Sequence, residues 1–197
     1  MKDTRYGDRY RVRRSSSASL CVLRVKFENA GAGLTGLGPE RHGAAMGRGK
    51  PSFMERAIAE AEAAAGRGEV PVGAVVVDGA TGTVLAAAGN RTGELSDPTA
   101  HAEMVVIREA AAGLGAPRLD GCDLYVTLEP CAMCAAAIGF ARVRRLYFGA
   151  YDAKGGGVEH GARIFDQPTC HHKPDVFGGI EETRCGALLK GFFADRR

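Results

Sequence analysis

The sequence predicts an α/β protein, a three-layer sandwich in which helices flank a mixed five-stranded sheet. Three features of the chain lead to this prediction. Two apolar strands first form a hairpin, strand-like and helix-like segments then alternate, and an amphipathic helix closes the chain. A hairpin supplies antiparallel neighbours, whereas alternating strands and helices supply parallel strands with crossover helices, so the two together predict a mixed sheet covered on both faces.

The ordered part of the chain is expected to begin at Ser52. Ser52 and Glu55 have the spacing of a capping box, and apolar residues follow at helical spacing until a Gly-rich stretch ends the helix. Residues 72–77 are rich in β-branched side chains and predict a strand. Turn residues at 78–82 then allow 84–88 to pair back as the second strand of a hairpin.

Six further elements are predicted from periodicity and from turn residues. In chain order they are a helix at 101–112 with Pro98 near its start, a strand at 124–127, a helix with Pro130 as its first residue and running to about Phe140, a strand at 143–148 followed by a Gly-rich loop at 155–157, a strand at 176–180, and a closing helix with apolar residues at 185, 188, 189, 192 and 193.

Residues 1–50 differ from the rest of the chain in composition. They carry 11 Lys/Arg against 4 Asp/Glu, a net charge of +7, whereas the remaining residues carry 15 against 19, a net charge of −4. They are expected to be a disordered extension or the result of a start codon placed too early. An Arg- and Ser-rich start is also found in organellar transit peptides, although Asp3 and Asp8 argue against one here. Residues 51–197 are the expected catalytic domain, and their acidic balance restricts any nucleic-acid surface to local clusters.

The cysteine content and the hydropathy pattern indicate a cytoplasmic protein without a membrane segment. The chain has six cysteines, two of them in a Cys-x-x-Cys, which does not resemble a secreted disulfide framework. No stretch approaches the roughly 18 uncharged apolar residues that would span a bilayer. The thiols are therefore expected to stay reduced and free to bind metal.

A metal site is predicted from His101, Cys131 and Cys134. The two cysteines are three residues apart at a predicted helix start, so that both sulfurs face one side, where the helix dipole favours thiolates. His101 lies at a second helix start and adds an imidazole nitrogen. Three protein ligands leave one position on Zn²⁺ for water, which is the catalytic arrangement, and we expect one zinc ion per subunit.

Glu103 distinguishes a catalytic zinc site from a structural zinc site or a redox pair. Taken alone, a Cys-x-x-Cys is also half of a structural zinc knuckle or a redox pair, and a Glu at a helix start also interacts with the dipole. A redox pair would not need a His-x-Glu, and a closed structural site needs a fourth ligand, which only Cys170-His171-His172 could supply. A carboxylate beside the metal is what water activation requires, so Glu103 is predicted to be the catalytic proton carrier.

The motifs His101-Ala102-Glu103 and Pro130-Cys131-Ala132-Met133-Cys134 resemble the signature of zinc nucleobase deaminases in the cytidine deaminase superfamily. Four stretches, at 68–74, 97–103, 127–134 and 149–154, narrow the resemblance to bacterial tRNA adenosine deaminases over about residues 52–197. The resemblance implies the cytidine deaminase-like fold, a homodimer with the helix up to Phe140 as a seam, and deamination of the wobble adenosine in the anticodon loop of an arginine tRNA.

The resemblance also implies substrate-binding residues. Asn90 is expected to contact the flipped nucleoside, Val72 and Ala102 to border the base pocket, and the Ala102 amide to be available to the purine. Asp152 matches an acidic residue near the RNA backbone. Asn90 and Asp152 could instead be ordinary turn or capping residues. In the loop region that the resemblance places against RNA, the sequence at 155–160 differs from that of the relatives. Five basic residues lie in or after this region: Lys154, Lys173, Lys190, Arg196 and Arg197.

In the implied reaction, Glu103 takes a proton from the activated water and delivers it to N1 of adenine while hydroxide attacks C6, and the product is inosine. A base paired in a helix cannot reach such a pocket, whereas a splayed base in an anticodon loop can. Two alternatives stay open. One is a free-base guanine or cytosine deaminase with the same zinc chemistry, and the other is a non-catalytic, zinc-stabilised RNA-binding module.

Overall fold

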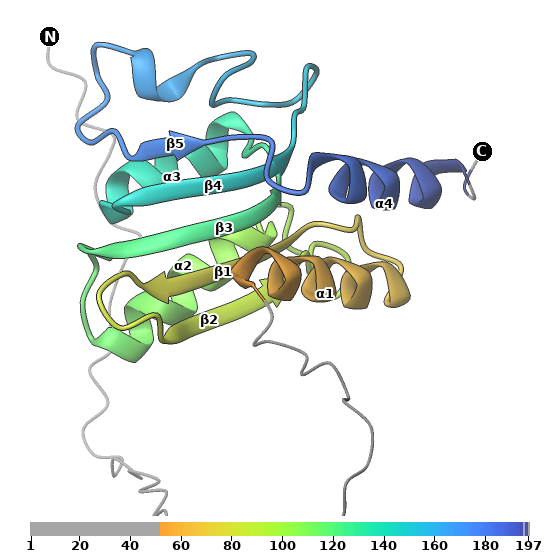
Figure 1. Cartoon of the computed structure of the whole chain (residues 1–197), viewed down its shortest axis with the longest axis horizontal. Coiled ribbons are helices and arrows are strands. Elements are labelled where there is room, and N and C mark those ends of the chain that lie inside the picture. Colours follow the sequence, from red (N-terminus) through yellow and green to blue (C-terminus); the bar gives the residue numbers. More distant parts are fainter. Residues whose placement is uncertain (1–51, 195, 197) are drawn as a thin grey trace, which may run out of the picture. The chain divides into compact units, whose positions relative to one another are not determined.

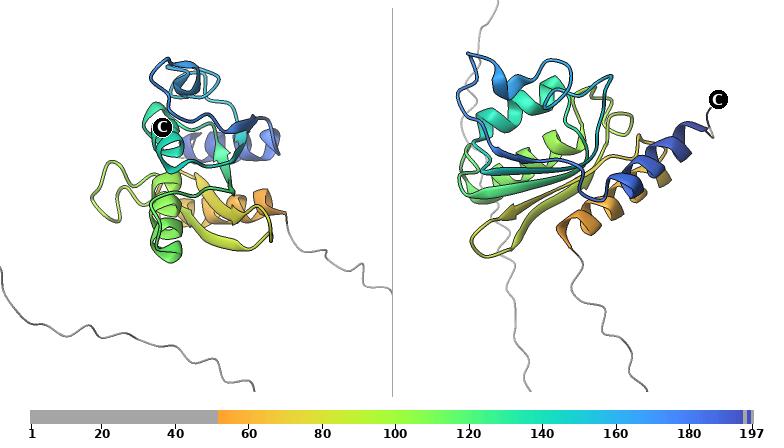
Figure 2. Two further views of the ribbon diagram at one scale, coloured as in Figure 1. Left: turned by 90° about the vertical axis from the view of Figure 1, so that its left-hand side faces the viewer. Right: turned by 45° about the horizontal axis from the view of Figure 1, so that its top comes forward.

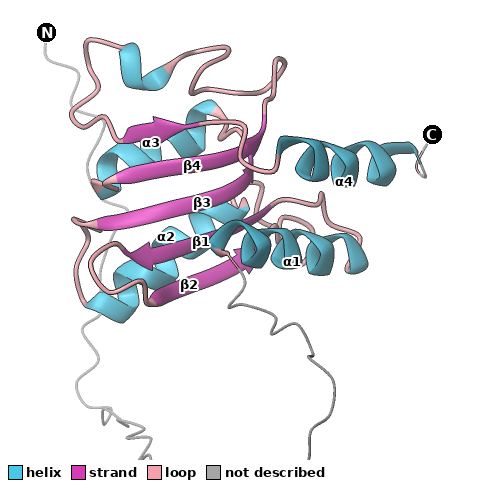
Figure 3. Ribbon diagram, viewed as in Figure 1, coloured by secondary structure: helices cyan, strands magenta, loops and turns pink. Residues whose placement is uncertain are grey.

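The computed structural model describes residues 52–194 and 196, so the extension predicted at 1–50 lies outside the described residues. Five strands and four α-helices follow one another along the described part (Figures 1 and 3). In chain order they are α1 (Phe53–Gly66), β1 (Gly73–Asp78), β2 (Val84–Gly89), α2 (Ala102–Leu114), β3 (Cys122–Leu128), α3 (Ala132–Ala141), β4 (Arg145–Ala150), a short 3-10 helix η1 (Ile164–Asp166), β5 (Asp175–Phe177) and α4 (Glu182–Ala194).

The sheet has the strand order β2-β1-β3-β4-β5. Strand β1 runs antiparallel to both of its neighbours, whereas β3, β4 and β5 run parallel to one another. Helices α2 and α3 cover one face and α1 and α4 lie on the other, as the right-hand view of Figure 2 shows. The predicted three-layer sandwich around a mixed five-stranded sheet is therefore confirmed.

Helix α1 begins where the sequence places its capping box. The Ser52 hydroxyl oxygen accepts a hydrogen bond of 3.1 Å from the backbone N–H of Glu55, and the Glu55 carboxylate accepts one of 2.8 Å from the Ser52 N–H. These two bonds satisfy amides that have no partner inside the helix. The helix then buries Ala57, Ile58 and Ala61 completely against the sheet, so the apolar spacing of this segment is confirmed as a core face.

The start of α3 differs from the prediction. Pro130 was expected to be the first helical residue, but Cys131 has an extended backbone (φ −67°, ψ 171°) and is the N-cap, so that the helix begins at Ala132. The cause is tertiary, because Cys131 forms a bridge with Gly156 and the Pro130 carbonyl accepts a hydrogen bond from the Gly157 N–H. A residue that is paired with an extended neighbour cannot also adopt helical backbone angles.

The end of the chain also differs in detail. Strand β5 stops at Phe177, short of the predicted residue 180, since Gly178 lies against the Phe148 ring and Gly179 has a φ of +79°. Helix α4 is amphipathic as predicted, but it is only partly covered: Cys185 is buried, whereas Phe193 is 48% exposed. Within the described residues, no helix has both the length and the apolar character needed to cross a membrane.

Candidate active site

Two helix starts bring the three predicted metal-binding side chains together. His101 is the N-cap of α2, Cys131 is the N-cap of α3, and Cys134 lies in the first turn of α3. The His101 Nδ1 is 3.7 Å from the Cys131 Sγ and 3.5 Å from the Cys134 Sγ, and the three atoms lie within 4.8 Å of one another. Residues 30 and 33 positions apart in the sequence thus form one cluster.

The spacing of this cluster fits a zinc ion. With Zn–S and Zn–N bonds of about 2.3 and 2.0 Å and tetrahedral angles, a sulfur and a nitrogen on one zinc are about 3.6 Å apart. Both measured separations, 3.5 and 3.7 Å, lie close to that value. Three protein donors with this spacing leave one tetrahedral position for a water molecule, as in catalytic rather than structural zinc sites.

The electrostatics of the cluster favour a thiolate at Cys131. Hydrogen bonds from the Cys134 thiol and from His101 lower the pKa of Cys131 to about 4. The pKa of Cys134 is raised, since it shares its proton with Cys131 and is buried. The pKa of His101 is raised by its hydrogen bond with Cys131. A cation that binds to thiol groups displaces their protons, so metal binding here would be coupled to proton release.

Glu103 lies in the first turn of α2, on the same side of the helix start as the cluster. Its residue exposure is 3%, and burial raises the pKa of its carboxyl group. Its Oε2 atom is buried and has no hydrogen-bond partner. A buried carboxyl group with a raised pKa and an unpaired oxygen has the properties of a general acid–base group, which must both accept and release a proton.

Asn90 joins the end of β2 to the start of α2. Its side-chain Oδ1 accepts a hydrogen bond of 2.9 Å from the Ala102 N–H, and its own N–H donates 2.9 Å to the Val72 carbonyl oxygen. All three residues are buried and form a bonded row next to His101. The Ala102 amide, which was expected to be available to a purine, therefore already has a protein partner in this structure.

Asp152 acts as a capping residue of a turn, which is the alternative to a contact with RNA. Its Oδ1 accepts hydrogen bonds from the N–H groups of Lys154 and Gly155, at 3.0 and 2.9 Å, and so caps the turn after β4. The structure assigns it no further contact with the metal cluster, and a direct role in substrate binding stays a prediction.

The Cys170-His171-His172 stretch does not supply a fourth metal ligand. The His172 ring nitrogen Nε2 lies 2.7 Å from the Val143 carbonyl oxygen, and the Cys170 thiol donates to the His172 carbonyl oxygen. Among the described residues, the possible metal-binding cluster contains only the predicted histidine and two cysteines. A closed structural site of four protein ligands is thus not supported by this stretch.

The candidate basic residues are unequally available. Lys173 forms an ion pair of 2.7 Å with Asp166, and the Arg196 guanidinium lies 3.6 Å from the centre of the Phe192 ring. Lys154 and Lys190 are exposed, and Arg197 lies outside the described residues. Two of the five side chains are therefore already in contact with neighbours from the protein.

Sequence reasoning missed two buried carboxylates beside the site. The Glu129 side chain is fully buried, and Glu69, next to the 91–94 turn, is 7% exposed. Each accepts backbone hydrogen bonds from a loop more than 20 residues away along the chain. For Glu129 the available signal was an acidic residue directly after the apolar strand β3. The hydrogen-bond partners of either carboxylate could not be predicted from local spacing.

Comparisons with known proteins agree with this geometry. Residues 49–150 match the family model for the cytidine and deoxycytidylate deaminase zinc-binding region. The chain is 60% identical to the tRNA-specific adenosine deaminase of Agrobacterium fabrum over 145 residues, which cover 74% of this chain and 94% of that protein. It is 43% identical to the Bacillus subtilis enzyme of the same name over 145 residues, 74% of this chain and 89% of that protein.

A solved structure from a study of A-to-I editing by tRNA:A34 deaminases is 61% identical and has a TM-score of 0.68, over 70% of this chain and 98% of that chain. The guanine deaminase from Nitrosomonas europaea is 24% identical with a TM-score of 0.64, over 72% and 83%, and shares the fold. Fold, cluster and family model together define a zinc-dependent hydrolytic deaminase. The chain belongs to the tRNA-specific adenosine deaminase family, within the cytidine deaminase superfamily.

Proposed function

We propose that this protein deaminates the wobble adenosine in the anticodon loop of an arginine tRNA to inosine, in the cytoplasm. The observation that carries the proposal is the cluster of His101, Cys131 and Cys134 beside the buried Glu103. The 60% identity to a tRNA-specific adenosine deaminase, over nearly the whole of that relative, supports RNA rather than a free base as substrate.

His101, Cys131 and Cys134 would hold one zinc ion per chain, which when bound supplies Lewis-acid activation of a water molecule. Glu103 takes a proton from the attacking water molecule and delivers it to N1 of adenine as the water oxygen bonds to C6. Glu103 then moves the remaining proton from that oxygen to the exocyclic amino group, and the C6–N bond breaks to release ammonia and leave inosine. Burial raises the pKa of Glu103, which favours a carboxyl group that must both accept and donate protons.

Substrate binding is assigned to the row of buried residues beside His101. We assign Asn90 the contact with the flipped nucleoside, because its Oδ1 already bonds the Ala102 amide and its side-chain NH₂ group can donate to a base. Val72 belongs to the same row, since its carbonyl oxygen accepts from the Asn90 N–H, and it would form an apolar border of the pocket. Asp152 shapes the turn beside Lys154, and this turn would lie near the RNA backbone.

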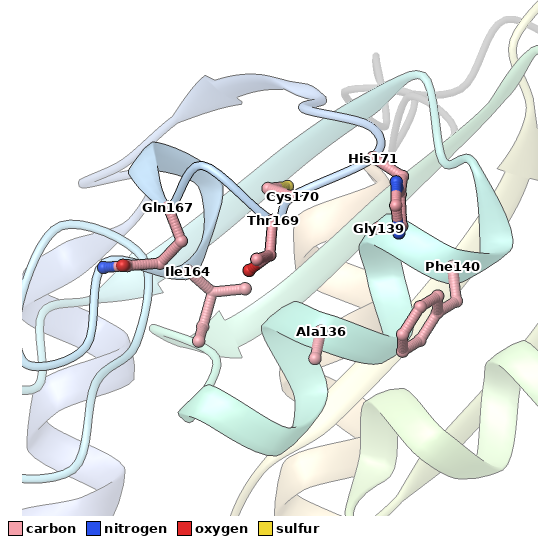
Figure 4. Close-up of a pocket in the computed structure, with 8 residues that line it drawn as sticks. All are labelled: Ala136, Gly139, Phe140, Ile164, Gln167, Thr169, Cys170 and His171. Carbon is pink, nitrogen blue, oxygen red and sulfur yellow. The ribbon is translucent and has the colours of Figure 1, made fainter.

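The pairing of two chains is assigned to an apolar pocket at α3. Phe140 is 73% exposed there, and the pocket is open between α3 and the loop that follows η1 (Figure 4). It is lined by Ala136, Gly139, Phe140, Ile164, Gln167, Thr169, Cys170 and His171. A second copy would cover the Phe140 ring, so Phe140→Ser should shift the protein toward monomers in analytical ultracentrifugation.

The test of the proposed function compares substrates directly. Purified protein loaded with zinc is incubated with an arginine tRNA anticodon stem-loop, with stem-loops of other tRNAs, and with free guanine, cytosine and adenosine. Inosine at the wobble position of the arginine stem-loop is the expected product, and binding should weaken with salt because counterions are displaced from phosphates. Faster turnover of any free base than of the stem-loop would contradict the assignment.

A further inference from the structure

The side chain of Glu129 is the centre of an unusually dense group of hydrogen bonds. Its Oε1 accepts from the N–H groups of Val158, Glu159 and His160, at 3.3, 2.8 and 2.9 Å. Its Oε2 accepts from the Asp152 N–H at 3.1 Å and lies 2.7 Å from the Nδ1 of His160. Five donors from one loop, residues 152–160, thus converge on a single carboxylate.

This carboxylate is completely buried, at 0% side-chain exposure. An ionised group stays inside a protein only when its lone pairs are satisfied. Among the described residues, the loop supplies all of the hydrogen-bond partners of this carboxylate, so the buried charge and the position of the loop depend on each other.

The loop held in this way lies directly against the metal-binding end of α3. The Gly157 N–H donates 2.8 Å to the Pro130 carbonyl oxygen, and Gly156 forms a bridge with Cys131. A Cβ atom added to Gly156 would lie 2.6 Å from the Glu129 carboxyl carbon, and one added to Gly157 would lie 2.5 Å from the Ala132 nitrogen. Only glycine permits this close approach at either position.

We propose that Glu129 is a positioning residue that fixes the 152–160 loop as a wall of the active site and thereby sets the affinity for the RNA next to the reacting base. The inference rests on the proposed function. The reacting base must reach the cluster that contains Cys131, so the nucleotides attached to that base must pass the backbone segment that pairs with Cys131. The loop pairs with the backbone of Cys131, whereas the Cys131 and Cys134 sulfurs contact the His101 ring and not the loop.

The substitution Glu129→Gln tests this assignment with little change in shape. An amide keeps one acceptor oxygen and replaces the other by a donor, so at least two of the five loop donors lose their acceptor. We expect the KM for the anticodon stem-loop to rise about tenfold, a change typical of losing a hydrogen bond to a charged acceptor. The kcat should stay within about threefold of wild type, and the zinc content should be unchanged.

The matched control is Glu109→Gln, which makes the same chemical change at an exposed position of α2. Amide hydrogen exchange gives a second readout, because the N–H groups of residues 158–160 should exchange faster in Glu129→Gln and not in the control. Faster exchange with a KM within twofold of wild type would show that the loop does not contribute to substrate affinity. Unchanged exchange would show that Glu129 does not hold the loop, and either result would overturn the inference.

A second variant covers the case in which Glu129→Gln does not fold. Gly156→Ala leaves every charge in place but forces the loop away from the Glu129 carboxyl group, so it should raise the KM in the same direction. An unchanged KM in Gly156→Ala would contradict the inference. If wild-type protein does not deaminate the stem-loop at all, the proposed function fails. If wild-type protein does deaminate it but the KM is unchanged in both variants, only this inference fails, so the two failures can be told apart.

Discussion

The side-chain oxygen of Asn90 accepts a hydrogen bond of 2.9 Å from the backbone N–H of Ala102. Asn90 directly follows β2 and Ala102 begins α2, so this bond links the sheet edge to the helix whose first turn carries Glu103. It also satisfies a buried amide at the start of α2, which has no partner inside the helix. Asn90 consequently has both a structural contact and a side-chain NH₂ group that is left for substrate.

Two substitutions separate these roles of Asn90. Asn90→Ala removes both, so kcat/KM for the stem-loop should fall by roughly 10- to 100-fold, consistent with about 1–3 kcal/mol for an unpaired buried polar group, and the melting temperature should also fall. Asn90→Asp keeps the acceptor for the Ala102 N–H but removes the donor, so it should lose activity with a smaller change in melting temperature. Full activity in Asn90→Asp would exclude donation to the base.

Zinc content is expected to depend on both cysteines of α3. Cys131→Ala and Cys134→Ala should each lose most of the bound zinc and much of the thermal stability, because an open set of three ligands cannot spare one. Cys170→Ala is the matched control and should retain zinc, since its thiol contacts the His172 carbonyl oxygen instead. Elemental analysis measures the outcome, and full occupancy in Cys131→Ala or Cys134→Ala would show that the ligand set is wrong.

Glu103→Gln should separate metal binding from chemistry. The amide has the same shape but cannot carry protons, so zinc and RNA binding should persist while turnover falls by about 10²- to 10⁴-fold, the range typical of losing a general acid–base group. His101→Ala offers the contrast, because it should lose zinc and turnover together. Single-turnover assays with measured zinc content distinguish the two variants. Near wild-type turnover in Glu103→Gln would contradict the role of Glu103 as proton carrier.

The pH dependence of the free energy of unfolding should show how much the ionised Glu69 carboxylate stabilises the fold. The Glu94 N–H at 2.8 Å lowers the pKa of Glu69 most strongly, burial opposes it, and the Thr92 hydroxyl at 3.0 Å lowers it further. Because the folded pKa lies below the unfolded value, the stabilisation is complete above the unfolded pKa and is lost as pH falls through the folded pKa. Glu69→Gln should therefore lower the free energy of unfolding at pH 7 by about 1–3 kcal/mol.

That difference between wild type and Glu69→Gln should shrink as the pH falls below about 4, the region where a free Glu becomes protonated. Urea unfolding of both proteins at several pH values measures it, and zinc loss at low pH affects both proteins alike. Glu109→Gln, at an exposed position of α2, should show no such trend. A difference that stays constant with pH would mean that the charge of Glu69 is not the source of the stabilisation.

The boundary of the catalytic domain is tested by removing residues 1–50. The capping box at Ser52 is complete within the remaining chain, so the shortened protein should keep its melting temperature and its zinc content. Differential scanning calorimetry of both proteins would check this, and a loss of several degrees would contradict a domain that begins at 51.

The sequence by itself determined the order of helices and strands and identified the residues of the candidate metal cluster. Apolar periodicity and caps are local signals, so the capping box at Ser52 and the apolar spacing of α1 were sufficient to place that helix. Cys131 and Cys134 were predicted to face one side because residues three apart near a helix start do so in any context. Their proximity to His101 followed from the resemblance to a known motif, and the structure brings the three atoms together.

Tertiary structure alone decided which carboxylates are buried and which backbone groups they bind. Glu129 accepts hydrogen bonds from residues 23 to 31 positions away, and no short-range pattern predicts such partners. The same limit explains why Pro130 was placed inside α3, since the bridge between Cys131 and Gly156 extends the backbone there. Local sequence spacing sets the conformation of a segment, whereas the satisfaction of a buried polar group depends on segments that meet only after the chain has folded.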